Sequence, residues 1–135
     1  MRFFTPIFPQ LSLILLNLYA WKFTNLYYNL PMKSLFEWDQ NKAESNLKKH
    51  RVSFETAVRA FADPFALTEQ DRIKNGEYRW QTLGVVDGQF LLLVAHTILD
   101  GENGIENIRI ISARRAEPKE KKRYEQNYSL LVGFK

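Results

Sequence analysis

Hydrophobic and polar residues follow two rhythms, a helical period of about 3.6 residues and a strand period of about 2, which predict the elements from residue 34 onward. Ser34–Trp38 is predicted as a short strand. Asp39 is a favourable helix N-cap, because its carboxylate can accept hydrogen bonds from the free amides of the first turn, and this helix should reach about Lys49. Ser53 caps a second predicted helix, which Asp63-Pro64 ends and whose buried stripe is Phe54, Ala57, Val58 and Phe61.

A β-hairpin is the strongest local signal in the chain. Two apolar runs, residues 78–86 and 89–98, flank Asp87-Gly88, a pair typical of a two-residue type I′ turn. Such a turn fixes the pairing of the two strands and sets Arg79 opposite His96. Both would then lie at the open end of one face, which we expect to be the core face and which carries Leu83, Val85, Phe90, Leu92 and Val94.

The remaining elements complete an α+β order. Phe65–Glu69 is predicted as a strand before a polar turn at Asn75-Gly76, and Ile105–Arg114 as the last strand. Pro118 suits the first turn of a final helix that continues through Gln126. The predicted order is thus a strand, two helices, four strands and a helix. We expect one antiparallel sheet of about four strands, with two N-terminal helices and one C-terminal helix on one of its faces.

Composition narrows the possible chemistry. The chain has 135 residues, which suits one domain, and its 45% hydrophobic residues exclude a wholly disordered chain. Because there is no cysteine, disulfides, thiolate metal sites and cysteine nucleophiles are excluded. The two histidines are His50 and His96, and neither the zinc-binding HExxH motif nor a phosphate-binding GxxxxGK motif occurs. We therefore expect neither a metal ion nor another cofactor.

Residues 1–31 differ in kind from the rest of the chain. They carry two basic residues and no acidic one, whereas residues 32–135 carry 17 basic and 15 acidic residues, a net charge of +2 (17 − 15). A membrane-spanning helix needs about 20 mostly apolar residues, and uninterrupted apolar runs such as Leu13–Leu16 are short, so we expect no membrane span. Three interpretations stay open: an upstream extension before a domain that begins at Met32, a signal peptide or membrane anchor, and a structural element.

Basic residues gather in four clusters, at the end of the first helix, before the hairpin, at the end of the last strand and on the last helix: Lys48-Lys49-His50-Arg51, Arg72 with Lys74, Arg114-Arg115, and Lys119, Lys121, Lys122 and Arg123. Lysine and arginine neutralise phosphates, so a polyanion such as nucleic acid is one interpretation of their target. The net charge is mild, however, and a basic helix face is commonly solvated surface, which is the other interpretation.

Either histidine could perform acid–base chemistry near neutral pH. His50 ends a helix, where the helix dipole favours its charged form and where a histidine commonly serves as a helix-terminal group. His96 opposite Arg79 would suit phosphodiester cleavage, with the arginine stabilising the charge that develops on the phosphate. A packed strand residue whose ring nitrogens are satisfied locally is the alternative for His96.

Three blocks of sequence resemble the family of BrnT toxins, in order and with suitable spacing. They are Phe36-Glu37-Trp38-Asp39 with Lys49-His50, Val52-Ser53-Phe54 and Phe61-Ala62-Asp63-Pro64; Arg79-Trp80 with Leu83-Gly84 and Gly88; and Ile108-Arg109-Ile110-Ile111-Ser112-Ala113-Arg114 with Ala116, Glu120 and Tyr124. The resemblance covers roughly Leu35–Gln126. It departs from the family pattern at Arg51, which replaces a glycine, so we expect the first helix to end without a left-handed cap.

The resemblance implies a RelE-like α+β fold and the toxin of a type II toxin–antitoxin system, a metal-independent endoribonuclease that inhibits translation and growth. It implies a cytoplasmic protein that a BrnA-like ribbon-helix-helix antitoxin neutralises in a hetero-oligomer, and that meets operator DNA only through this antitoxin. A catalytically inactive module that only pairs with an antitoxin-like partner is the alternative.

The resemblance also implies roles for residues at matched positions. The catalytic residues would be His50, Arg79 and Arg114, with Lys49 in support. His96 joins this set through the hairpin register alone. Phosphates of the RNA would be held by Arg72, Arg115 and Lys48. Glu120 and Tyr124 are expected to bond Arg114 structurally.

Overall fold

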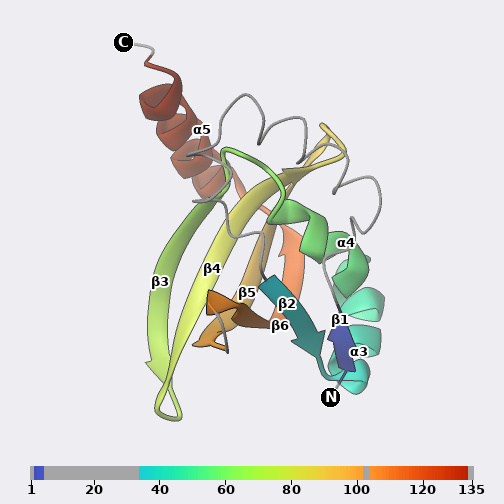
Figure 1. Cartoon of the computed structure of the whole chain (residues 1–135). Helices are drawn as coiled ribbons and strands as arrows, with labels where there is room; N and C mark the ends of the chain where they lie inside the picture. The colour runs from blue at the N-terminus through green and yellow to red at the C-terminus, as the bar shows by residue number, and fades with distance from the viewer. Residues whose placement is uncertain (1, 5–33, 102–103, 134–135) are drawn as a thin grey trace, which may run out of the picture.

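The computed structural model describes residues 2–4, 34–101 and 104–133 (Figure 1). Its elements in chain order are β1 (Arg2–Phe4), β2 (Ser34–Trp38), α3 (Gln40–His50), α4 (Phe54–Ala60), β3 (Leu67–Lys74), β4 (Glu77–Val86), β5 (Phe90–Asp100), β6 (Glu106–Arg115) and α5 (Pro118–Val132). The predicted first strand, both N-terminal helices and the final helix are confirmed. Apart from residues 2–4, the segment 1–31 and its three interpretations lie outside the described residues.

Capping side chains start both N-terminal helices, as predicted. Asp39 Oδ1 accepts a hydrogen bond from Asn41 N–H at 2.8 Å, and Ser53 Oγ accepts one from Thr56 N–H at 3.0 Å. The end of α3 differs from the prediction, because Arg51 adopts a left-handed conformation with φ = 60° and its N–H donates back to the last turn of the helix. The left-handed ending therefore persists with an arginine, at a position where glycine carries less strain.

The sheet has six strands in the order β1-β2-β6-β5-β4-β3, five of them from residue 34 onward. Strands β3 to β6 form an antiparallel meander, but β2 runs parallel to β6, with Phe36 paired with Ile108. The predicted α+β class is confirmed, whereas the prediction of an antiparallel sheet of about four strands is wrong. The physical reason is the connection between β2 and the meander. It runs through α3 and α4, which cross one face of the sheet and leave β2 parallel to and beside β6. Within the described residues no helix is long and apolar enough to cross a membrane.

Helices cover both faces of the sheet, and not one face as predicted. α3 and α4 pack on the face that carries Val94 and Ile110. α5 packs on the opposite face, where Tyr124 contacts Leu83 and Leu93. The central strands β4 and β5 therefore divide their side chains between two cores by alternation. Figure 1 shows α5 at the end of the sheet that lies away from the β3–β4 turn, so it covers only part of its face.

The hairpin turn forms as predicted, but the strands beyond it are shifted by one residue. Asp87 and Gly88 have φ values of 56° and 66°, and Gln89 N–H donates to Val86 O at 3.1 Å, as a type I′ turn requires. Gln89 then stands outside the ladder, so Val86 pairs with Phe90. The predicted register, which counted Gln89 as the first paired residue, is therefore wrong.

This shift changes which side chains share a face. Trp80, and not Arg79, pairs with His96. Because neighbouring side chains on a strand point to opposite faces, Arg79 lies on the α5 face and His96 on the face covered by α3 and α4. The predicted common face of the hairpin is also wrong, since Leu83 packs with the α5 core and Val94 with the other core.

Asp63 was expected only to end a helix, but it also joins its own loop to β4 and α5. Its carboxylate accepts hydrogen bonds from Phe65 N–H at 2.9 Å, from Val85 N–H at 2.8 Å and from Tyr124 O–H at 2.5 Å. Burial and the hydrogen bond to Asp63 raise the pKa of Tyr124 above its ordinary value, so its hydroxyl stays a donor. Asp63 thus fixes α5 against β4.

Candidate active site

The part of the α5 face that α5 leaves uncovered carries a row of arginines. Arg72 of β3 pairs with Arg79 of β4, and Thr97 of β5 pairs with Arg109 of β6. The β4–β5 ladder ends at Trp80 and His96, and by alternation the next residues, Arg79 and Thr97, both point to the α5 face. Paired residues share a face and lie about 5 Å apart. We call Arg72, Arg79, Thr97 and Arg109 the arginine row.

Two β-bulges put arginines into this row. The ladder shifts between Gln70 and Arg72, so Asp71 is an extra residue on β3. Without this extra residue, the alternation of side chains along β3 would place Arg72 on the face covered by α4. A second shift, opposite Ala95 and His96 of β5, makes Ile111 the extra residue on β6, and it brings Arg109 to the same face as Arg114.

Glu77 sits between two arginines of the row. Arg109 Nη2 donates to Glu77 Oε2 at 2.6 Å, and Arg79 Nη2 lies 3.7 Å from the same oxygen. The side chains of Arg79, Arg109 and Glu77 are 17%, 26% and 41% exposed, so the cluster is reached from solvent but partly desolvated. Two other carboxylates lie beside these arginines: Glu37 pairs with Arg109 across β2 and β6, and Asp71 Oδ2 lies 3.7 Å from Arg72 Nε. The row is therefore a cluster of arginines interleaved with carboxylates.

The row also contains buried hydrogen-bonding groups without a partner. Within the described residues, Arg79 Nε and Thr97 Oγ1 are buried and make no hydrogen bond. Buried polar groups are nearly always satisfied, so a polar ligand at this place would complete their bonding. A phosphate fits this need, because a guanidinium can donate two parallel N–H bonds to its oxygens.

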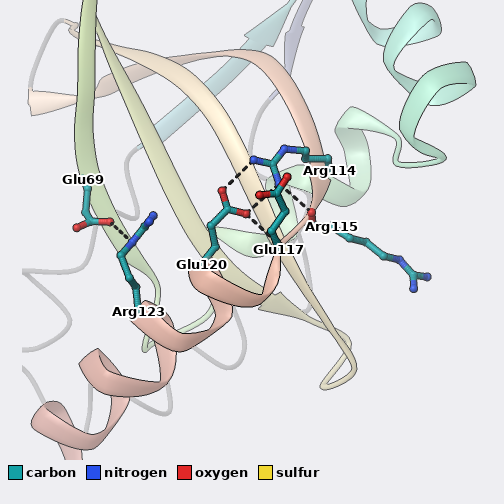
Figure 2. Close-up of polar contacts among 6 residues, drawn as sticks. All are labelled: Glu69, Arg114, Arg115, Glu117, Glu120 and Arg123. Atoms are coloured by element: carbon teal, nitrogen blue, oxygen red, sulfur yellow. Dashed lines mark hydrogen bonds and ion pairs between the residues drawn. The ribbon is translucent and has the colours of Figure 1, made fainter.

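Arg114 lies on the same face as the arginine row, but its guanidinium group is bonded to Glu120 of α5. It donates to Glu120 Oε1 at 2.9 Å and to Glu120 Oε2 at 2.8 Å, as Figure 2 shows. This bidentate hydrogen bond raises the pKa of Arg114 and lowers the pKa of Glu120. Glu120 Oε1 also accepts from Glu117 N–H at 2.8 Å, so the pair fixes the start of α5. Arg114 pairs with Leu93, four residues or about 14 Å along β5 from Thr97.

His96 lies in the core and not beside Arg79. Its side chain is fully buried, its Nε2 lies 2.8 Å from Thr82 Oγ1, and its ring contacts the ring of Phe61 at 5.0 Å. Burial lowers the pKa of His96 to about 4, so the ring is neutral at physiological pH. This placement matches the packed strand residue that was the alternative interpretation of His96.

The other predicted residues lie on the side of α3. Lys48, Lys49 and His50 form the last turn of α3, and the first two are exposed. Arg115 pairs with Leu92, whose side chain belongs to the core under α3 and α4. Its guanidinium carbon lies 4.4 Å from the centre of the Phe90 ring, and Figure 2 shows the side chain directed away from Glu120.

The structure therefore divides the predicted site into separate groups. The uncovered face holds Arg72 and Arg79, Arg114 lies farther along it, His96 is in the core, and the remaining four lie on the other side. Sequence reasoning missed Arg109 and Glu77. A signal was present for Arg109, since it is a charge inside the apolar run Ile108–Ile111 and so marks a strand position that does not face the core.

Comparison with known proteins agrees with the resemblance in the sequence. The sequence profile described as "Ribonuclease toxin, BrnT, of type II toxin-antitoxin system" matches residues 38–120. Among solved structures, the crystal structure of the Brucella abortus ribonuclease toxin BrnT is similar at 20% sequence identity and a TM-score of 0.44, covering 61% of this chain and 95% of that one. Among curated proteins none matches. Since the family profile spans more than half of the chain, this protein belongs to the BrnT family of ribonuclease toxins of type II toxin–antitoxin systems.

Proposed function

We propose that this chain is an active, metal-independent endoribonuclease whose substrate phosphate binds at the arginine row. The observation that carries this proposal is the convergence of Arg79 and Arg109 on one face, with the unpartnered buried atoms Arg79 Nε and Thr97 Oγ1 in the same row. Membership of the family supports the reaction class, and the geometry of the arginine row supports this placement of the anion.

In this chemistry the 2′-hydroxyl of the RNA attacks the adjacent phosphate and displaces the 5′-oxygen. Negative charge grows on the phosphate oxygens in the transition state. Arg79 and Arg109 are held by β4 and β6, the two strands that flank β5, so the sheet fixes both and they can meet this charge without reorganising. Arg72, which is 68% exposed at the edge of the row, would hold an adjacent phosphate. Arg114 would act indirectly, by fixing α5 through Glu120.

The test is cleavage of RNA by the purified chain in the presence of a chelator. Wild type should give fragments with 2′,3′-cyclic phosphate and 5′-hydroxyl ends, and the Arg79→Ala, Arg109→Ala variant should lose cleavage. The matched control is Lys48→Ala, Lys49→Ala, which removes the same charge from the other side of the molecule. Loss of cleavage in the control, together with full cleavage by the arginine variant, would refute the placement of the site.

Membership of a type II toxin family implies a cognate antitoxin. We propose that this partner is a BrnA-like ribbon-helix-helix protein, which forms a cytoplasmic hetero-oligomer with the toxin and alone contacts operator DNA. Co-expression of this antitoxin with the toxin should relieve the growth arrest that the toxin causes, and the two proteins should form a stable complex. A chain that binds the antitoxin but never cleaves RNA would instead be the inactive binding module.

A further inference from the structure

Cleavage at the arginine row needs a base for the 2′-hydroxyl, and neither histidine can reach it. His96 is buried on the opposite face, and His50 ends α3, which packs on that opposite face. The base must therefore come from another titratable group on the uncovered face. General bases in proteins are most often histidine or a carboxylate, so the carboxylates of this face are the candidates.

Most carboxylates of the uncovered face are already committed or shielded. Glu120 is bonded to Arg114 and its side chain is 7% exposed. Glu37 is 8% exposed. Glu69 is half exposed, but it pairs with Arg123 of α5 at 3.3 Å and lies next to the part of the face that α5 covers. Glu77, which is 41% exposed, is the carboxylate that contacts both Arg79 and Arg109, whereas Glu37 pairs with Arg109 across β2 and β6 but is nearly buried.

We propose that Glu77 is the general base of the ribonuclease reaction, an inference that rests on the proposed function. Its Oε2 is anchored by Arg109 at 2.6 Å, whereas within the described residues its Oε1 accepts no hydrogen bond. One oxygen thus fixes the orientation of the carboxylate and the other is free for the substrate. Arg79 on the same strand, Lys74 paired across β3 and Arg109 on β6 are the charged groups that face it.

The reaction balances with these groups and water. Glu77 takes the proton of the 2′-hydroxyl, the 2′-oxygen forms a bond to phosphorus, and the bond from phosphorus to the 5′-oxygen breaks. Water protonates the leaving 5′-oxygen, and Glu77 later returns its proton to water. Protonation removes the negative charge that holds Arg109 and Arg79, so both guanidinium groups become available to the phosphate just as its own charge grows.

The test compares Glu77→Gln with Glu69→Gln in single-turnover cleavage of a short RNA. Both residues are about equally exposed glutamates paired with arginine on one face, so the second is a matched control. Glu77→Gln should lower the cleavage rate constant roughly 100- to 10,000-fold, while its Kd for an uncleavable 2′-deoxy analogue stays within threefold. The wild-type rate constant should fall at acid pH, and this limb should vanish in the residual activity of Glu77→Gln. Glu69→Gln should behave like wild type.

Thermal unfolding and a second variant guard against a folding defect. Glu77→Asp keeps a carboxylate at shorter reach and should retain more activity than Glu77→Gln at similar stability. If Glu77→Gln cleaves within threefold of wild type while Arg79→Ala, Arg109→Ala is inactive, the inference is overturned and the proposed function stands. If the wild-type chain cleaves no RNA at all, the proposed function is refuted, and so is the inference that rests on it.

Discussion

Asn46 is the single side chain whose loss should destabilise the fold most clearly. It is buried in α3, and its Nδ2 donates to Val52 O and to Ala113 O, both at 2.9 Å. Its Oδ1 accepts from Ala113 N–H at 3.1 Å. One amide thus joins α3 to the following loop and to β6.

Replacing Asn46 with alanine leaves three buried backbone groups without partners: two carbonyls and one N–H. Each such group costs about 1–3 kcal/mol. Even near the low end of that range, the free energy of unfolding should fall by about 4 kcal/mol. For a domain of this size, such a loss lowers the Tm by roughly 15 °C.

The assay is urea unfolding of the full chain, followed by tryptophan fluorescence and circular dichroism. Asn41→Ala is the matched control, because Asn41 is exposed on the same helix and only its backbone takes part in capping. It should change the free energy of unfolding by less than about 0.5 kcal/mol. Asn46→Asp preserves the volume but opposes an acceptor to two carbonyls, so it should destabilise at least as strongly as alanine. A loss below about 1 kcal/mol for Asn46→Ala would refute this account.

Three further predictions test other parts of the fold. Gly84→Ala should lower the free energy of unfolding by about 3 kcal/mol or more in the same urea assay, because its Cβ would lie 2.1 Å from Ala60 O of α4. His96 has a pKa lowered to about 4 by burial, so unfolding takes up a proton between that value and its ordinary 6.5. Stability should therefore fall by roughly 3 kcal/mol as pH drops across this window, and His96→Gln should flatten the profile. Arg51→Gly should raise the free energy of unfolding by about 1 kcal/mol, and with it the Tm, because glycine relieves the strain at φ = 60°.

Local signals in the sequence predicted the elements well, because the physics that sets them is local. The caps at Asp39 and Ser53 need only the residues of one helical turn. The parallel pairing of β2 with β6 joins residues about 70 positions apart, and no local pattern encodes it. The prediction that all helices cover one face failed for the same reason. Alternation within one hairpin does not show which face of the sheet a helix distant in sequence will cover.

The candidate site was predicted in part, and the reason lies in three single-residue irregularities. An extra residue at Gln89 separates Arg79 from His96, and the bulges at Asp71 and Ile111 turn Arg72 and Arg109 toward Arg79. Strand periodicity assumes an unbroken ladder, so each irregularity reverses the face of every side chain beyond it. A bulge loses a ladder hydrogen bond, and two of them converge on a single row of the sheet. Their shared effect is to gather arginines at one place, which is the arrangement that binding a phosphate requires and that packing a core does not.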